Sequence, residues 1–294
     1  HRGGVVTLGT FDGLHRGHRA LVGEALAIAE RRGRPALMLS FEPMPREFLQ
    51  PDSPPARLTN FRERWRLLQR SGLDALCLLR FDARLRAMRG HEFVGLLYET
   101  LRPEALVAGY DFRFGRQGEA SAELLVSEGR RLGFSVEVIA PVLEGAARVS
   151  SSAVREALSR GELAQAEAQL GRPYSIRGRV VAGERLGRQL GYPTANLRLE
   201  RRRSPLGGIF AVRVHGVGER PRPGVASLGT RPTVGGVEPL LEVHLFDFAG
   251  DLYGREIELA FVQKMRDEAN LDCLDALVEQ MNRDAHEARS ILAA

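Results

Sequence analysis

Two histidines, His15 and His18, lie three residues apart at the end of a glycine-rich segment, Gly9-Thr10-Phe11-Asp12-Gly13-Leu14-His15-Arg16-Gly17-His18. An apolar run from Val5 precedes this segment, so the pattern predicts a strand, a turn and the first turn of a helix. Residues at i and i+3 share a helix face, and we expect both imidazoles beside the partly positive helix N-terminus, which favours phosphate oxygens. The same spacing occurs in metal sites, but no third ligand cluster of metal spacing follows.

A run of serines is a second candidate phosphate site. It lies in Arg148-Val149-Ser150-Ser151-Ser152-Ala153-Val154-Arg155. Hydroxyls before a helix offer O–H and N–H donors, and Arg155 adds a charge one turn further on. Such a run is otherwise an ordinary helix cap, and it is the upstream histidines that favour phosphate binding.

A proline turn and a strand glutamate form a separate candidate site. The turn, Gly191-Tyr192-Pro193-Thr194-Ala195-Asn196, places Thr194 and Asn196 on the same side of an extended chain. Their oxygens suit Mg²⁺, which also keeps water and substrate phosphates as ligands. Glu242 lies in an alternating segment, where its carboxylate could accept a proton from an attacking alcohol. Taken alone, the turn and the glutamate would be an ordinary proline turn and an exposed strand residue.

The first half of the chain alternates apolar and amphipathic segments. We expect strands at 5–10, 36–41, 75–81, 106–108 and 135–139, and helices at 17–32, 61–70, 91–101 and 120–132. This alternation predicts a parallel sheet with helices on both faces and ligands at the carboxyl ends of its strands. Two short helices, 150–160 and 162–169, lead to Gly171-Arg172-Pro173, where we place the boundary between domains 1–170 and 174–294.

The second half contains short apolar segments separated by glycine- and proline-rich turns. Strands are expected at 176–181, 209–214, 224–227, 241–246 and 257–261, which favours a small antiparallel barrel. The last segment predicts a helix that docks on the barrel through one apolar stripe, formed by Leu274, Leu277, Val278, Met281, Ala285, Ala288 and Leu292.

Composition restricts the class of partner. The chain has 294 residues, 44% of them hydrophobic, and a net charge of +5 carried by arginines dispersed among acidic residues. This pattern predicts small-molecule ligands and no nucleic acid, and no apolar run suggests a membrane segment. Two distant cysteines indicate a reducing, cytoplasmic setting. Because the chain starts at His1, shortly before its first strand, we expect a short segment to precede it, and no oligomeric state is indicated.

These segments resemble a known family. The pattern G-x-F-D-G-x-H-x-G-H resembles the HxGH nucleotidyltransferases and is closest in wording to the bacterial bifunctional riboflavin kinase/FAD synthetases, with a likeness that runs from Val5 to the C-terminus. Pro193–Asn196 resembles the PTAN signature of riboflavin kinases. The resemblance implies an N-terminal Rossmann-like FMN adenylyltransferase domain with a parallel sheet, followed by an antiparallel riboflavin kinase barrel with a C-terminal helix.

The resemblance also implies roles for individual residues, with ATP and Mg²⁺ as cofactors and riboflavin, FMN and FAD as substrates and products. Glu242 would be the catalytic base of the kinase, and Thr194 and Asn196 would hold the metal. His15 and His18 would be catalytic in adenylyl transfer. ATP and its phosphates would bind at Gly9, Phe11, Gly13, Gly17, Arg148, Ser150, Ser151, Ser152 and Arg155.

Flavin would bind in two segments of the chain. The first is Gly109-Tyr110-Asp111-Phe112-Arg113-Phe114-Gly115, where Asp111 and Phe112 are the candidates and a buried phenylalanine is the alternative for Phe112. The second is Lys264-Met265-Arg266-Asp267-Glu268, where Arg266 and Glu268 are the candidates. The family often has a phenylalanine where this chain has Leu271.

Two other functions remain open at this point. The protein could be a nucleotidyltransferase for another phosphate substrate, with the barrel as an accessory module. It could also be a flavin- or nucleotide-binding regulator without catalysis. A pure binder needs no base, so the combination of His15, His18, Thr194, Asn196 and Glu242 argues for an enzyme.

Overall fold

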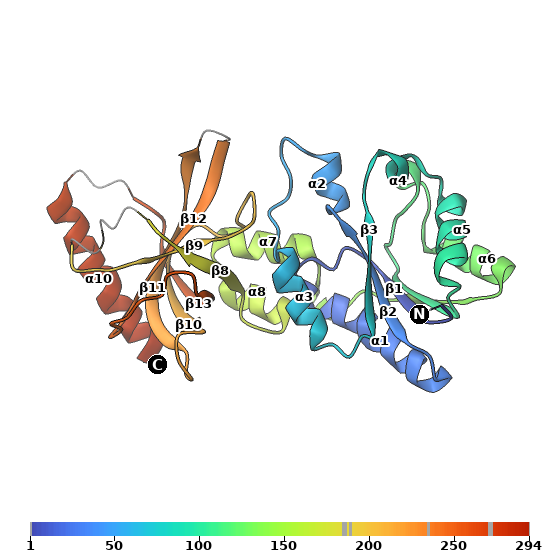
Figure 1. Ribbon diagram of the computed structural model, residues 1–294, viewed down its shortest axis with the longest axis horizontal. Helices are drawn as coiled ribbons and strands as arrows, with labels where there is room; N and C mark the ends of the chain where they lie inside the picture. The colour runs from blue at the N-terminus through green and yellow to red at the C-terminus, as the bar shows by residue number, and fades with distance from the viewer. Residues whose placement is uncertain (1, 184–186, 188–189, 234–235, 270–272, 294) are drawn as a thin grey trace. The chain divides into compact units, whose positions relative to one another are not determined.

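The structure is a computed structural model that describes residues 2–183, 187, 190–233, 236–269 and 273–293. Leu271 lies outside the described residues. The chain forms two compact units, one of His1–Pro55 with Arg64–Ser150 and the other of Ala56–Glu63 with Ser151–Ala294 (Figure 1). By these contacts residues 151–170 group with the second unit, while the domain limits 1–170 and 174–294 stay a prediction.

The first unit is built on a five-stranded parallel sheet, which confirms the predicted α/β class. Its strand order is β3-β2-β1-β4-β5, so β1 lies between β2 and β4, where the chain reverses its direction of winding. Ligands of such sheets bind at the carboxyl end of the strands at this point. The strands are β1 (Val5–Leu8), β2 (Ala36–Glu42), β3 (Ala75–Arg80), β4 (Ala105–Gly109) and β5 (Ser135–Ile139).

Helices cover both faces of this sheet, as predicted. Successive residues of β1 point to opposite sides: Val5 packs with α1, whereas Val6 packs with α5 and α6. The helices of the segment are α1 (Arg16–Arg32), α2 (Pro45–Leu49), α3 (Phe61–Gln69), α4 (Ala83–Ala87), α5 (Gly90–Leu101) and α6 (Ala122–Leu132), with short 3-10 turns η1 (Asp12–Leu14) and η2 (Arg116–Gly118).

Helices α2 and α4 were not expected from the sequence. Each has five residues, which is too short to show a helical period. Both depend on their first turn instead: Glu47 accepts a hydrogen bond from the Met44 amide at 3.2 Å, and Asp82 accepts one from Leu85 at 2.9 Å.

The second unit contains a closed antiparallel barrel, which confirms the predicted fold. Its order is β10-β11-β12-β9-β8-β13, and the strands are β8 (Ser175–Val181), β9 (Ala195–Arg198), β10 (Gly208–His215), β11 (Arg222–Thr233), β12 (Gly236–Leu245) and β13 (Glu256–Arg266). Strand β9 was not expected, and β11 extends well beyond the predicted 224–227. Gly224, the first residue of the predicted strand, lies within β11, where a Cβ atom would come 2.6 Å from the carbonyl oxygen of His244.

Apolar side chains fill the barrel, and helices cover its outside. Leu241, Val243 and Leu245 of β12 point into the core, so the alternate residues Glu242 and His244 face outward. Helix α10 (Leu274–Ala293) packs on β10, β11 and β13, and its Ala288 and Leu292 are buried there, as the apolar stripe predicted. Helices α7 (Ser151–Arg160) and α8 (Leu163–Leu170) add to the barrel core.

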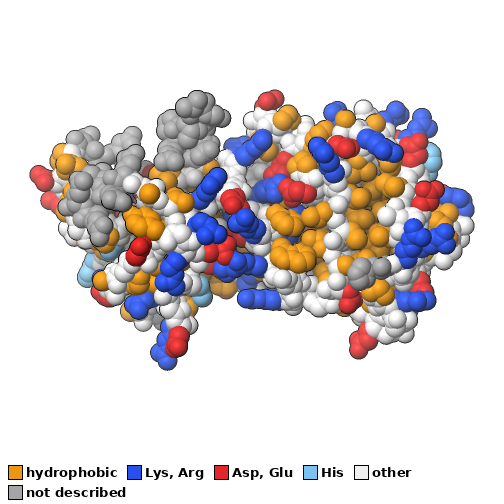
Figure 2. Space-filling view, viewed as in Figure 1, with side chains coloured by type: hydrophobic (Ala, Val, Ile, Leu, Met, Phe, Trp, Pro, Cys, Tyr) orange, Lys and Arg blue, Asp and Glu red, His pale blue; other side chains and the backbone are white. Residues whose placement is uncertain are grey.

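The surface shows mixed charge. Arginine side chains lie among carboxylates over the face drawn in Figure 2, and apolar atoms are exposed along the first unit's sheet. Leu78 of the edge strand β3 has 40% of its surface exposed.

Candidate active sites

The histidine segment of the first unit is a tight turn between β1 and α1. Phe11 and Gly13 both have positive φ angles, 53° and 78°, so the chain reverses sharply after the strand. Helix α1 begins at Arg16, and His15 is its N-cap residue, with a ring Nδ1 that accepts a hydrogen bond from the His18 amide at 3.3 Å. His15 therefore precedes the helix and is not on its face, which corrects the sequence expectation. The two imidazoles nonetheless lie together, stacked with centroids 3.7 Å apart.

The cap hydrogen bond fixes which nitrogen of His15 carries a proton. A neutral imidazole whose Nδ1 accepts a hydrogen bond must carry its proton on Nε2. Nε2–H is a donor, the chemistry that a phosphate oxygen needs. Gly17 supports this ring position, since a Cβ atom there would come 3.2 Å from the His15 ring.

Phe11 packs in the core of the first unit. Its side chain is fully buried, so a contact to a nucleotide would come from its backbone, and its binding role stays a prediction. Gly9 makes room for this ring, because a Cβ atom at Gly9 would lie 3.2 Å from it. The close approach of Gly9, Gly13 and Gly17 to phosphates stays a prediction.

Arg64 of helix α3, which no sequence motif indicated, supports the same turn. Its guanidinium is fully buried and donates to the Thr10 carbonyl at 2.9 Å and to Glu42 of β2 at 2.9 Å. Ser40 also donates to the Thr10 carbonyl, at 3.2 Å. An arginine in an amphipathic helix looks like a surface residue in sequence, so nothing there indicated a buried role.

Arg148 and Asp111, predicted to bind different ligands, form an ion pair with each other. Arg148 lies in the two-residue strand β7 (Ala147–Arg148), which pairs with β6 (Leu143–Glu144), and its guanidinium also lies 4.9 Å from the centre of the Tyr110 ring. Phe112 is half-buried and stacks on Phe114 with centroids 5.5 Å apart. The structure thus joins the two predicted segments within the first unit.

The serine run spans the division between the units. Ser150 ends the first unit, and Ser151 and Ser152 open helix α7 in the second. Arg155 lies one turn into the helix as expected, but its Nε donates to the Ala56 carbonyl at 2.6 Å. The structure therefore gives Arg155 an anchoring contact within the second unit, and its phosphate role stays a prediction.

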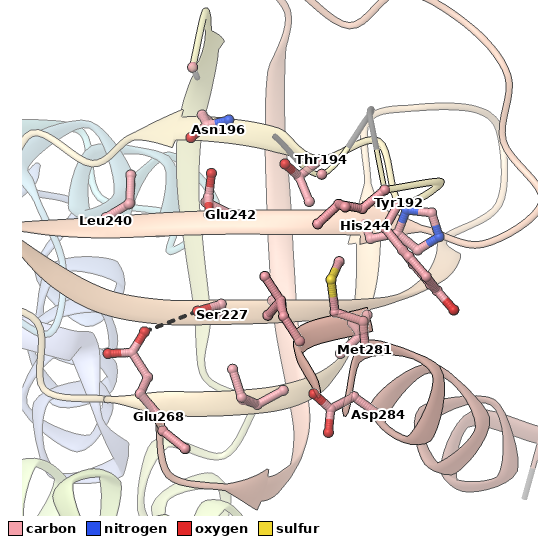
Figure 3. Close-up of a pocket in the computed structure, with 18 of the residues that line it drawn as sticks. Tyr192, Thr194, Asn196, Ser227, Leu240, Glu242, His244, Glu268, Met281 and Asp284 are labelled. Atoms are coloured by element: carbon pink, nitrogen blue, oxygen red, sulfur yellow. Dashed lines mark hydrogen bonds between the residues drawn. The ribbon is translucent and has the colours of Figure 1, made fainter. Parts of the chain in front are cut away.

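The second unit has a cavity of about 410 Å³ on the outside of the barrel, next to α10 (Figure 3). Every predicted kinase residue lines it: Thr194, Asn196, Glu242, Arg266 and Glu268. Other lining residues, which the sequence analysis did not select, include Gly183, Gly187, Tyr192, Ser227, His244, Met281 and Asp284.

Strand register brings the central residues of this cavity together. Glu242 of β12 lies directly opposite Asn196 of β9 and, on its other side, opposite Ser227 of β11. Ser227 in turn donates to Glu268 at 3.1 Å, so the segment after β13 is held over the same face (Figure 3). Ser227 and His244 could have been found from sequence, because alternation places them on the outer face of the barrel.

Two contacts restrict the ends of the cavity. The Arg266 guanidinium binds Asp284 of α10 through two hydrogen bonds, Nε to Oδ1 at 2.9 Å and Nη2 to Oδ2 at 2.6 Å, and this contact raises the pKa of Arg266. At the other end, Gly183 lies so close to the Asn196 amide that a Cβ atom would collide with it. The backbone at Gly183 therefore forms a wall directly against Asn196.

Together, a parallel α/β unit with a histidine-capped helix and a barrel with an oxygen-lined cavity define a two-part nucleotide-dependent transferase. Residues 1–153 match the family model described as FAD synthetase, and residues 170–292 match the one described as riboflavin kinase. The chain belongs to the bifunctional riboflavin kinase/FMN adenylyltransferase family.

Relatives and a solved structure cover nearly the whole chain. The bifunctional riboflavin kinase/FMN adenylyltransferase of Escherichia coli K12 is 46% identical over 98% of this chain and 92% of its own length. That of Pseudomonas fluorescens is 44% identical over 100% of this chain and 94% of its own. A crystal structure titled macrolide-efflux protein, from Streptococcus pneumoniae, superposes with a TM-score of 0.84 at 33% identity and covers 98% of this chain and 94% of that one.

The described residues contain no group of three or more His, Cys, Asp or Glu side chains that could hold a metal ion by themselves. Within the same residues, we find no helix with the length and apolar character needed to cross a bilayer.

Proposed function

We propose that this protein makes FAD in two steps. The second unit phosphorylates riboflavin with ATP to give FMN, and the first unit transfers an adenylyl group from ATP to FMN, releasing pyrophosphate. The observation that carries the proposal is the convergence of Thr194, Asn196 and Glu242 on one cavity of a flavokinase-type barrel. A binding protein would not need a carboxylate beside two metal-type oxygen donors.

In the kinase step, Glu242 takes the proton of the terminal ribityl hydroxyl of riboflavin. The hydroxyl oxygen forms a bond to the γ-phosphorus of ATP while the bond from that phosphorus to the β,γ-bridging oxygen breaks, and ADP leaves. The pairing of β12 with β9 places Glu242 directly opposite Asn196, so the backbone register sets the separation between the base and the phosphate-binding groups.

The cavity fits Mg²⁺ by the chemistry of its donors. Thr194 and Asn196 supply neutral oxygens, and Gly183 packs closely on the Asn196 amide. Mg²⁺ prefers oxygen ligands and keeps water and substrate phosphates, so a site with few protein charges suits it. When bound, the ion neutralises charge on the ATP phosphates.

In the adenylyl step, a phosphate oxygen of FMN attacks the α-phosphorus of ATP and pyrophosphate departs. The FMN phosphate is already ionised near neutral pH, so no strong base is needed. The Nε2–H of His15 and the imidazole of His18 donate to ATP phosphate oxygens as charge grows on the leaving group. Positioning and electrostatic stabilisation account for most of the rate in such reactions.

The remaining assignments follow from these two steps. Arg148, the serines at 150–152 and Arg155 contribute to binding ATP phosphates, and Asp111, Phe112, Arg266 and Glu268 bind flavin. The partners are small molecules, without nucleic acid or membrane, and the protein works in the cytoplasm.

One assay tests the proposal. Purified protein is incubated with riboflavin, ATP and Mg²⁺, the flavins are separated by chromatography, and a parallel reaction starts from FMN. We expect FMN and FAD from riboflavin, FAD from FMN, and neither product when EDTA removes the metal. Neither FMN nor FAD above background in the reaction that starts from riboflavin would refute the kinase assignment. No FAD from supplied FMN would favour another phosphate substrate for the first unit.

A further inference from the structure

We propose that His244 is a positioning residue of the kinase site. It holds the carbonyl of Pro193 and thereby sets where Thr194 lies relative to Glu242. The inference rests on the proposed riboflavin kinase function, since Thr194 and Glu242 are assigned there to metal binding and proton transfer.

The hydrogen-bond ladder between β9 and β12 ends just before Thr194. Strand β9 pairs with β12 from Leu197 back to Ala195, and the pairing stops there. Proline has no N–H, so Pro193 cannot donate to a continued ladder. Its carbonyl oxygen instead lies 2.9 Å from the Nδ1 of His244, which belongs to β12, the strand that pairs with β9. A side-chain hydrogen bond thus takes over where the backbone ladder ends.

The chemistry of this contact fixes the proton of His244. A carbonyl oxygen only accepts hydrogen bonds, so the Nδ1 of His244 must carry the proton. Residues two apart on a strand face the same side, so the hydrogen bond to Pro193 and the carboxylate of Glu242 lie on the same face of β12. One strand therefore carries the proposed base and also holds the turn that carries the proposed metal ligand (Figure 3).

Neighbouring aromatic rings hold the His244 imidazole in this orientation. The Tyr192 ring meets it edge-on with centroids 5.1 Å apart, and Phe246 does so at 5.8 Å. Phe246 is 1% exposed and packs with buried residues of α10, so it is a fixed wall. The Tyr192 hydroxyl also bonds Asn282 of α10. The turn before Thr194 is thus fastened to β12 by His244 and to α10 by Tyr192.

Loss of the His244 donor should weaken binding of magnesium with ATP more than binding of riboflavin. Thr194 directly follows the held carbonyl, whereas Glu242 is fixed by its own strand. A hydrogen bond of this kind contributes about 1–1.4 kcal/mol, which corresponds to a five- to tenfold change in affinity.

The test compares His244→Leu with His244→Asn. The two substitutes have nearly the same branched shape, but only the asparagine amide can donate to the Pro193 carbonyl in place of Nδ1. For His244→Leu we expect the KM for magnesium-ATP in FMN formation to rise about five- to tenfold, with the KM for riboflavin within about twofold of the parent. For His244→Asn we expect both constants within about threefold of the parent. FAD formation from FMN, in the other unit, serves as the internal control.

A second measurement does not depend on activity. Hydrogen–deuterium exchange of the peptide around residues 190–197 should be faster in His244→Leu and parent-like in His244→Asn, and calorimetry with magnesium and a non-hydrolysable ATP analogue should show the same order. Both measurements test the role of His244 without requiring kinase activity. A parent protein that makes no FMN would refute the proposed function and not the role of His244. A parent-like leucine variant would overturn the proposal. An asparagine variant that binds the nucleotide weakly but keeps the parent's melting temperature would also overturn the proposal. This second result tests the role of His244 even if the leucine variant does not fold.

Discussion

The two units build their candidate sites in opposite ways. In the first unit, the two histidines and three glycines lie within residues 9–18, at the end of one parallel strand. In the second unit, the cavity collects residues from β9, β11, β12, the end of β13 and α10, spread from Gly183 to Asp284. A phosphate site at a helix N-terminus can be local in sequence, whereas a cavity on a barrel depends on how distant strands align.

This difference determines which structural changes would displace the functional residues of each site. A shift of one residue in β12 would turn Glu242 into the barrel and Val243 out of it. The buried partners Leu241 and Val243, both fully inaccessible, oppose such a shift, so the barrel core fixes the register of the base. In the first unit, the position of His15 instead depends on one cap hydrogen bond and on the turn that Arg64 holds.

The largest effect should come from Glu242→Gln. We expect FMN formation from riboflavin to fall about a hundred- to ten-thousand-fold, because only this reaction needs an alcohol to be deprotonated. FAD formation from supplied FMN should stay within about twofold. Both rates are measured by chromatography of flavins. Glu256→Gln, a strand carboxylate of the same barrel away from the cavity, is the matched control. Kinase turnover close to that of the parent would make Glu242 an ordinary strand residue.

The reverse change, His18→Ala, should affect the first unit alone. We expect FAD formation from FMN to fall about a hundred- to a thousand-fold, since a preorganised donor to the departing pyrophosphate is lost. Riboflavin phosphorylation should continue, so FMN accumulates in the coupled assay.

The control for this change is His91→Ala, which alters an exposed histidine of α5. The interpretation that the two sites are independent would be wrong if both activities fell together in His18→Ala while the melting temperature stayed unchanged. That result would indicate one ATP site shared by both reactions.

Long helices, and strands that alternate with them, could be predicted from sequence. The five strands of the first unit and its longer helices α1, α3, α5 and α6 were predicted to within a few residues, because apolar and amphipathic segments alternate along this part of the chain. Glu242 and Asn196 were selected from separate motifs, and the barrel register then placed them opposite one another.

Contacts that depend on distant residues could not be predicted. β9 has four residues and follows a proline turn, so it is held by its neighbours and not by its own pattern. Phe11 belongs to a predicted binding motif, but its ring packs in the hydrophobic core of the first unit. Arg155 looked free to bind phosphate, but it meets the Ala56 carbonyl, 99 residues away in the chain.

A smaller effect should follow from Gly183→Ala. A Cβ atom there would collide with the Asn196 amide, which must then shift within the cavity. Overpacking of this kind costs about 1–3 kcal/mol, and we expect affinity for magnesium with an ATP analogue to fall roughly tenfold in calorimetry. Gly218→Ala is the matched control, because a Cβ atom there has nothing within 4 Å. Equal affinities in the two variants would show that Gly183 does not contribute to magnesium-nucleotide binding.

The smallest effect concerns the barrel seam where β8 meets β13, away from either site. Glu258 accepts a hydrogen bond from Ser175 at 2.7 Å and pairs with Arg177. Burial alone would raise the pKa of Glu258, but the Ser175 hydroxyl and the Arg177 charge outweigh it and lower the pKa below its ordinary value of 4.5.

A carboxyl group with a lowered pKa stabilises the folded state above its unfolded pKa, and this stability is lost as the pH falls through the folded pKa. At pH 7 we therefore expect Glu258→Gln to lower the melting temperature by about 2 °C, since a partly exposed pair contributes less than about 1 kcal/mol. The difference from the parent should persist to about pH 5 and shrink towards pH 3. Melting curves at several pH values, with the exposed Glu219→Gln as control, measure it. A constant difference from pH 7 to pH 3 would mean that Glu258 acts through packing and not through charge, and the barrel seam would then depend on its core as the sheet of the first unit does.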